Sequence, residues 1–174
     1  NYRLVADNLI DLSHVGFVHT STIGNPQMGE KGELTVTREE NRVRVHRNVP
    51  DVPPPPTYIK TGVLPAGKNI DRWQIIDFIP PCFVKIHVGG AQAGTGALEG
   101  RYEHGLNAWI LNAMTPETQE STHYFWASVR NHAVGDPVAD ELFFNQVSEA
   151  FEEDRVVLEA QQAVFNAAIP GVVN

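Results

Sequence analysis

A long helical segment near the carboxyl end of the chain sets the strongest constraint on the fold. Asp136 can cap its start, Pro137 suits the first turn, and the pattern continues to about Asn166, before Pro170-Gly171. At 100° per residue, five apolar residues fall on one narrow stripe: Phe143, Val147, Phe151, Leu158 and Phe165. A helix of this length needs a large apolar partner, and a curved sheet can supply one.

The residues before this helix predict such a sheet. Alternation of apolar and polar residues, or enrichment in β-formers, marks six predicted strands: 33–37, 42–47, 72–79, 82–88, 105–114 and 121–130. The first two form an expected hairpin. Residues 4–18 are expected to form one helix. The sequence therefore predicts an α+β domain, with a helix, an antiparallel meander and a long helix in that order.

Two stretches are expected to lie outside the sheet. Residues 49–56 are rich in proline, which has no N–H to donate in a central strand, so they are predicted to form an extended surface connection. Residues 89–96 are rich in glycine and are predicted to form a flexible loop, and no Lys-Ser/Thr pair follows them as a phosphate-binding loop requires.

Composition excludes several classes of protein. With 174 residues the chain is expected to be one domain, and its net charge of −8 argues against a nucleic-acid partner. The single cysteine, Cys82, cannot form an internal disulfide or hold an iron–sulfur cluster. The sequence has neither the roughly 20-residue apolar run of a membrane span nor a signal-peptide pattern at its start. A soluble protein of the cytoplasm, without a membrane partner, is the expectation.

An acidic residue interrupts the apolar stripe of the long helix. Asp154 lies at its middle, whereas Glu149, Glu152 and Glu159 point the opposite way. A buried carboxylate without a partner costs several kcal/mol, so Asp154 is expected to be protonated, paired with a cation, or bound to a metal. Candidate cations are Arg101 and Arg130, and the stripe alone leaves these alternatives open.

Polar residues interrupt the first predicted helix in the same way. Asn8, Asp11 and His14 share a face with apolar residues, and Asp11 lies one turn before His14, where it could accept the Nδ1 proton. In a straight helix His19 would diverge from His14 by about 140°, so both can face one ion only if the helix ends or widens near Gly16. Two imidazoles and one carboxylate suit catalytic Zn²⁺ or non-haem Fe(II).

The residues from Asn1 to His19 resemble the iron-site helix of the Rieske-type aromatic-ring oxygenases. The pattern Asn-x-x-Asp-x-x-His-x-x-x-x-His is matched at every defined position. Residues 114–118, 121–125, 130–131 and 153–159 look like the subgroup of vanillate O-demethylases and dicamba monooxygenase. The resemblance covers nearly the whole chain and implies the helix-grip fold of START-like domains.

The resemblance also implies roles for individual residues. His14, His19 and Asp154 would hold Fe(II), with O₂ as co-substrate. Asp11 would be the carboxylate that joins His14 to a cluster-ligating histidine of a neighbouring subunit, and Asn8 would stand beside the iron.

Substrate contacts are more variable in this subgroup. Asn112, three residues before Thr-Pro-Glu-Thr, occupies the position of a residue that meets the substrate carboxylate. Lys85, His87 and Asn145 are weaker candidates, because exposed polar residues of a strand or a helix explain them better.

The family's full subunit also carries a Rieske domain, whose [2Fe–2S] ligands are absent from this sequence. Residues 1–174 are therefore expected to be a single catalytic domain, as a fragment of a longer oxygenase subunit that forms a homotrimer and receives electrons from a reductase. The implied reaction is hydroxylation or O-demethylation of a methoxylated aromatic acid such as vanillate. The alternatives are ring hydroxylation of another aromatic, a zinc hydrolase, and a helix-grip module that binds a ligand without metal.

Overall fold

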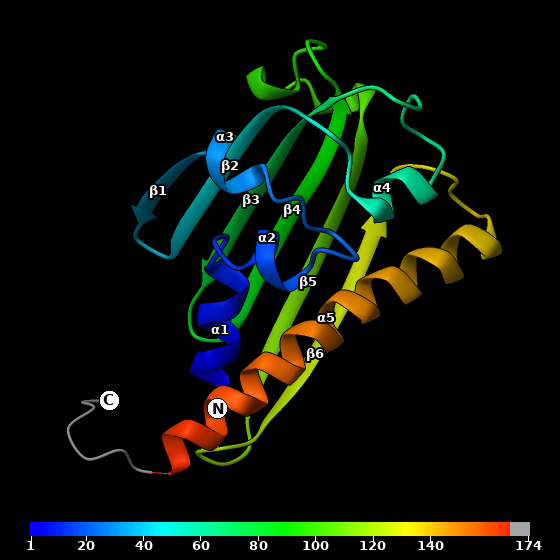
Figure 1. Cartoon of the computed structure of the whole chain (residues 1–174). Coiled ribbons are helices and arrows are strands. Elements are labelled where there is room, and N and C mark those ends of the chain that lie inside the picture. Colours follow the sequence, from blue (N-terminus) through cyan, green and yellow to red (C-terminus); the bar gives the residue numbers. More distant parts are fainter. Residues whose placement is uncertain (168–174) are drawn as a thin grey trace.

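The computed structural model describes residues 1–167 and contains one six-stranded antiparallel sheet (Figure 1). The strands follow one another in space as they do in the sequence, so the sheet is a simple meander. They are β1 (Glu33–Glu39), β2 (Arg42–Val52), β3 (Ile70–Ile79), β4 (Phe83–Gln92), β5 (Leu106–Pro116) and β6 (Thr122–Arg130). This architecture confirms the predicted α+β class and the predicted meander.

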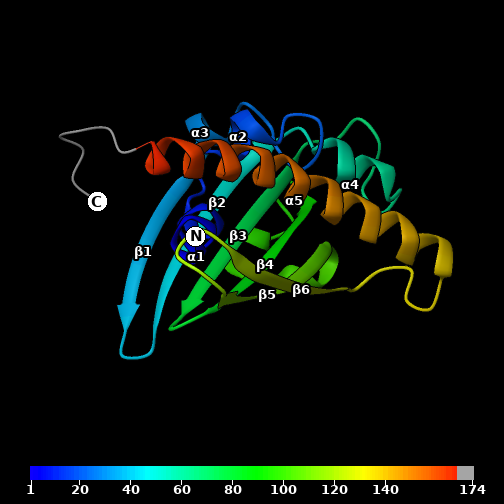
Figure 2. The same cartoon turned by 90° about the horizontal axis from the view of Figure 1, so that it is seen from below.

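The long helix α5 (Pro137–Asn166) crosses one face of the curved sheet, and the short helices α1, α2 and α4 share that face (Figures 1 and 2). The four short helices are α1 (Tyr2–Ile10), α2 (Val15–Val18), α3 (Met28–Lys31) and α4 (Pro56–Lys60). Two 3₁₀ turns, η1 (Ala97–Glu99) and η2 (Tyr102–His104), precede β5. Among the described residues, no helix combines the length and the apolar character that a membrane span requires.

Helix α5 begins as predicted, because the Asp136 side chain accepts hydrogen bonds from the N–H groups of Val138 and Ala139. Its buried residues are Gln146, Ala150 and Asp154, which form the centre of the face toward the sheet. Phe165 was expected in the buried stripe but is 47% exposed, because the end of the helix projects beyond the sheet (Figure 1). The predicted stop at Pro170-Gly171 lies outside the described residues.

Two strands, β2 and β4, extend into stretches that were predicted to lie outside the sheet. β2 continues through Pro50 to Val52, which pairs with Ile70 of β3. The proline is accommodated because β1 pairs with β2 only as far as Asn48, and the register with β3 shifts between Val49 and Val52. The expectation that residues 49–56 lie wholly outside the sheet is therefore wrong.

The expected glycine-rich loop is also partly strand, since β4 extends to Gln92. A Cβ at Gly89 would lie 2.1 Å from the Trp73 indole and 2.2 Å from the Leu106 carbonyl oxygen. The glycines thus leave room for a buried tryptophan on the neighbouring strand, and they do not mark a flexible loop.

The predicted first helix is two helices. α1 ends at Ile10, the carboxylate of Asp11 accepts a hydrogen bond from the N–H of Ser13, and α2 starts only at Val15. This local turn competes with helical hydrogen bonding, so the break falls before His14 and not at Gly16.

The main core lies between the sheet and the helices that cover it. It joins Leu9 and Leu12 of the amino-terminal segment to Ile76, Val84 and other buried strand residues. A smaller cluster around Trp73 lies on the opposite face of the sheet. The first core packs against the segment that carries the predicted metal ligands, so folding of the sheet also positions that segment.

Candidate metal centre and adjoining cavity

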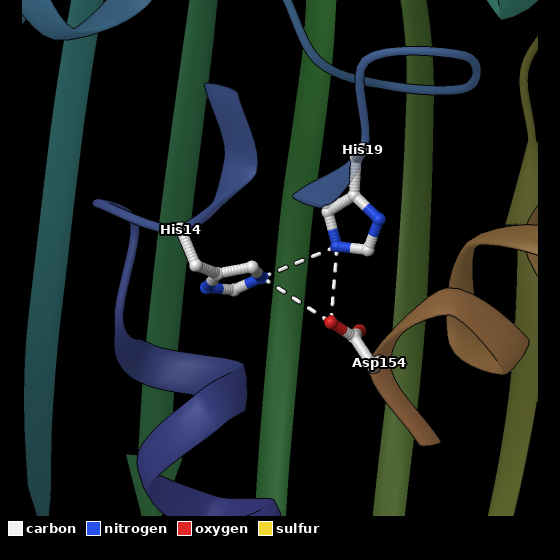
Figure 3. A group of neighbouring side chains, drawn as sticks. All are labelled: His14, His19 and Asp154. Carbon is white, nitrogen blue, oxygen red and sulfur yellow. Dashed lines mark hydrogen bonds and ion pairs between the residues drawn. The ribbon is translucent and has the colours of Figure 1, made fainter. Parts of the chain in front are cut away.

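The structure brings together the three side chains that the sequence proposes as metal ligands (Figure 3). His14 and His19 flank α2, and Asp154 reaches them from α5, 135 residues further along the chain than His19. The Nε2 atoms of the two histidines are 3.2 Å apart, and they lie 3.4 Å and 3.1 Å from Oδ1 of Asp154. One small triangle of donor atoms results.

The path of the backbone explains how both imidazoles reach this triangle. Because α1 ends before His14, the histidines are separated by a four-residue helix and are not fixed at the angle of one straight helix. Gly24 closes the segment: its N–H donates to the His19 carbonyl at 2.7 Å, and a Cβ there would lie 2.3 Å from the Val15 carbonyl oxygen. The glycine therefore allows the close backbone contact that holds His19 in place.

The triangle fits a single metal ion. Donor atoms about 2.1 Å from one ion lie about 3.0 Å apart at right angles and about 3.4 Å apart at the tetrahedral angle. The three observed separations of 3.1 to 3.4 Å fall between these limits. The donor set uses three positions, so it would leave others open for O₂, water or substrate.

Electrostatics also favour a cation at this place. Two imidazole nitrogens and a carboxylate oxygen face one another, and Oδ1 of Asp154 has no hydrogen bond of acceptable geometry within the described residues. Burial acts to raise the pKa of Asp154, but the adjacent imidazoles of His14 and His19 and the amide of Asn8 lower that pKa to about 2. The site therefore presents a buried carboxylate anion that a bound cation would neutralise.

Glu153 is a contact that the sequence analysis missed. Its Oε2 accepts hydrogen bonds from Nδ1 of His19 and from Oγ1 of Thr22, and its Oε1 accepts one from Oγ of Ser21, all at 2.7 Å. A proton on Nδ1 leaves the Nε2 lone pair of His19 directed into the triangle. Burial acts to lower the pKa of His19, but the carboxylates of Asp154 and Glu153 outweigh it and raise that pKa.

Asp11 and Asn8 lie at the edge of the centre. The predicted hydrogen bond from His14 to Asp11 is absent: Asp11 accepts from Ser13, and Nδ1 of His14 has no partner within the described residues. The prediction assumed one helical turn between the two residues, which the end of α1 removes. Asp11 is exposed beside His14, while Asn8 acts on Asp154.

The alternative of a structural ion pair at Asp154 is not what the structure shows. Arg130 pairs with Asp140, and Arg101 pairs with Glu99. Within the described residues the side chains that pair with Asp154 are the two histidines.

A cavity of about 130 Å³ adjoins the candidate metal centre. Its wall includes all three ligand residues and, from the sheet and α5, mostly apolar side chains such as Ile86, Ile110, Phe143 and Val147. Its volume is close to the roughly 150 Å³ of a core cavity that holds one benzene molecule, so it is of the size of a single aromatic ring. On its other side, Asp154 borders an open groove of about 590 Å³.

The predicted substrate contacts do not line this cavity. Lys85 and His87 lie on the opposite face of the sheet, where Lys85 pairs with Asp77 and His87 stacks on Trp109. Asn145 is exposed, and its neighbour Gln146 faces the cavity instead.

Asn112 is fully buried on the face of the sheet that α5 covers. Its amide donates to the Val84 carbonyl, and its carbonyl oxygen accepts a hydrogen bond from the Tyr124 hydroxyl. Its polar atoms are thus engaged within the protein.

Comparisons with known proteins agree with this fold and identify the family. The model of the vanillate O-demethylase oxygenase C-terminal domain family matches residues 1–173, so the chain belongs to that family. The vanillate O-demethylase oxygenase subunit of Pseudomonas sp. (strain HR199 / DSM 7063) is 34% identical over 93% of this chain and 46% of its own length. The toluene-4-sulfonate monooxygenase system iron-sulfur subunit TsaM1 of Comamonas testosteroni is 30% identical over 95% of this chain and 48% of its own length.

A solved structure gives the same result at the level of the fold. Dicamba monooxygenase bound to 3,6-dichlorosalicylic acid superposes on 100% of this chain with a TM-score of 0.83 at 26% identity, and the match covers 51% of that structure. The chain thus spans about half the length of the relatives it matches. It corresponds to the catalytic-domain part of oxygenase components of Rieske monooxygenase systems.

Proposed function

We propose that this chain is the iron-binding catalytic domain of a longer oxygenase subunit and that it hydroxylates a single-ring aromatic substrate. The observation that carries the proposal is the convergence of His14, His19 and Asp154 on one point in the wall of a ring-sized cavity. Family membership favours an oxygenase over the zinc hydrolase and over the metal-free binding module.

Fe(II), when bound, would supply the activation of O₂ with electrons from a Rieske [2Fe–2S] cluster. The residues of this chain perform the remaining tasks. The two imidazoles and Asp154 fix the ion at one end of the cavity, and Glu153 holds the orientation of His19. The apolar wall would exclude water and orient the ring, so that one substituent would lie nearest the three ligand side chains.

With a methoxylated ring, the proposed reaction is O-demethylation. One oxygen atom enters the methoxyl C–H bond, and the resulting hemiacetal releases formaldehyde and a phenol. The other oxygen atom leaves as water, with two electrons and two protons consumed. Aromatic acids such as vanillate are the substrates to which the sequence points, and the relatives' names include vanillate and dicamba demethylases.

The electron donor is proposed to be the Rieske domain of a neighbouring subunit in a homotrimer, supplied in turn by a reductase, within the cytoplasm. Two observations support this part of the proposal. The matched relatives are about twice as long as this chain and are named as components of larger systems. In the structure, Asp11 is exposed three residues before His14, where a partner could contact it.

The test combines the protein, carrying its Rieske donor, with a reductase and a panel of methoxybenzenes under O₂. We expect release of one formaldehyde per phenol formed, and a His14→Ala variant should release none. Phenolic product that forms without O₂, or formaldehyde release that survives loss of His14, would contradict the proposal.

A further inference from the structure

The cavity beside the metal centre contains polar groups that the proposed chemistry does not use. Apart from the ligand residues, Asn8 and Asp11 beside them, and Tyr58, five polar side chains line it: Thr57, Thr61, Gln74, His132 and Gln146. In two of them the side-chain oxygen atom is engaged within the protein. The hydroxyl of Thr61 donates to the Tyr58 carbonyl at 2.7 Å, and Oε1 of Gln74 accepts two hydrogen bonds from Arg47.

The other three have unused hydrogen-bonding capacity. Oγ1 of Thr57 and Nδ1 of His132 are buried and have no partner in the described part of the chain. Gln146 has a single, long hydrogen bond, from Nε2 to the Thr57 carbonyl at 3.4 Å, which leaves its second N–H unused. Thr57 is 5% exposed and Gln146 is 6% exposed, so bulk water does not reach them freely. A buried polar group without a partner costs about 1 to 3 kcal/mol.

Three separate elements bring these groups to one cavity. Thr57 belongs to α4, Gln146 to α5, and His132 follows β6. Figure 1 shows α4, the start of α5 and the end of β6 at the same end of the molecule. Gln146 precedes Asp154 by eight residues, which is about 12 Å along the helix axis. Gln146 and the proposed ligand Asp154 therefore line the same cavity about two helical turns apart.

The polar end of the cavity has no positive charge. No lysine or arginine of residues 1–167 lines the cavity. Arg47 is separated from it by Gln74, and Arg130, next to His132, pairs with Asp140. Burial and the charge of Arg130 lower the pKa of His132, so its imidazole is neutral at pH 7. A buried carboxylate would lack a cation here, whereas an uncharged group would need only hydrogen bonds.

We propose that Thr57, Gln146 and His132 recognise an uncharged, oxygen-bearing substituent, such as a carboxamide, at the end of the ring away from the metal. The inference rests on the proposed function, because it takes the cavity as the substrate site. It departs from the aromatic acids to which the sequence points, and it names as substrates neutral aromatics with a polar group that accepts hydrogen bonds.

The test compares the affinities of three probes for the protein loaded with Fe(II) under anaerobic conditions. The probes are 3-methoxybenzamide, 3-methoxybenzoate and 3-methoxytoluene, which differ at one ring position. We expect the amide to bind about tenfold more tightly than the toluene, in line with one or two buried hydrogen bonds. We also expect it to bind at least as tightly as the benzoate.

Variants assign the effect to residues. Thr57→Val and Gln146→Leu should each remove most of the preference for the amide and leave binding of 3-methoxytoluene unchanged. Thr61→Val is the matched control, because its hydroxyl is already bonded to the Tyr58 carbonyl, and it should change no affinity by more than about twofold. Circular dichroism and thermal melting verify that each variant is folded.

Three results would overturn the inference. In the first, 3-methoxybenzoate binds about ten times more tightly than 3-methoxybenzamide. In the second, the variants lower the affinities for all three probes equally, and in the third the parent protein binds none of the probes. Failure of the proposed function would give a different result. The protein would still prefer the amide through Thr57 and Gln146, but it would form no product from any methoxylated ring. That outcome would support the recognition site and contradict the proposed reaction.

Discussion

Glu153 offers the sharpest prediction, because it touches the proposed metal site through one ligand. Its carboxylate accepts hydrogen bonds from His19, Ser21 and Thr22, each at 2.7 Å. In Glu153→Gln, the amide oxygen can still accept from His19 and Thr22, while the NH₂ group can donate to the hydroxyl of Ser21. The geometry is kept and the charge is lost. In Glu153→Ala all three hydrogen bonds are lost.

The expected losses follow from this difference. Removing the partner of a metal-bound histidine lowers metal affinity by about 10- to 100-fold, which corresponds to about 1.4 to 2.8 kcal/mol. We expect the glutamine variant near the lower limit and the alanine variant near the upper one. The assay is anaerobic competition between the protein and a chelator for Fe(II). Absorption spectra of the Co(II)-loaded protein report whether the ligand geometry is retained.

Glu149→Gln is the matched control, since Glu149 is an exposed carboxylate of the same helix. It should leave the metal affinity unchanged. The reasoning is refuted if both Glu153 variants bind Fe(II) within about twofold of the parent, or if the glutamine variant is as weak as the alanine variant.

Two further predictions concern stability. Gly24→Ala would place a Cβ 2.3 Å from the Val15 carbonyl oxygen and 2.7 Å from that of His19. The variant should lose about 1 to 3 kcal/mol of unfolding free energy in urea and should also bind metal more weakly. A urea midpoint equal to that of the parent would contradict the close contact. The hydrogen bond from Arg44 to Asp77 lowers the pKa of the Asp77 carboxyl in the folded protein. The ionised carboxylate therefore stabilises the fold above the ordinary aspartate pKa of about 3.9, and this stabilisation is lost as the pH falls through the lower pKa of the folded state. The parent should therefore be more stable than Asp77→Asn at pH 6 and lose this advantage in acid, and a difference that stays constant down to pH 2 would argue against it.

The sequence could predict the metal triangle because its signals are strong. Asp154 stands where the helical period requires an apolar residue, and Asn8, Asp11 and His14 interrupt an apolar face in the same way. His19 follows His14 at the spacing of the family pattern. What could not be predicted was the path between the histidines. A local hydrogen bond from Ser13 to Asp11 ends α1, and such a turn competes with helix at a small free-energy difference.

The errors at the cavity have a related cause. Lys85 and Asn145 each lie one residue away from a position that faces the cavity, Ile86 on the strand and Gln146 on the helix. One residue reverses the face of a strand and rotates a helix by 100°. Register of this kind depends on how the sheet and α5 pack together, which the local pattern does not specify. Glu153 was missed for the same reason, as the neighbour of the residue that carried the signal.

The most direct test of the account is the position of bound iron. Crystals of the protein loaded anaerobically with Fe(II) should give one anomalous peak per chain at the iron edge, about 2.1 Å from the Nε2 atoms of His14 and His19 and from a carboxylate oxygen of Asp154. A peak at another place, or no peak between these three groups in iron-loaded crystals, would contradict the metal centre on which the proposed function depends.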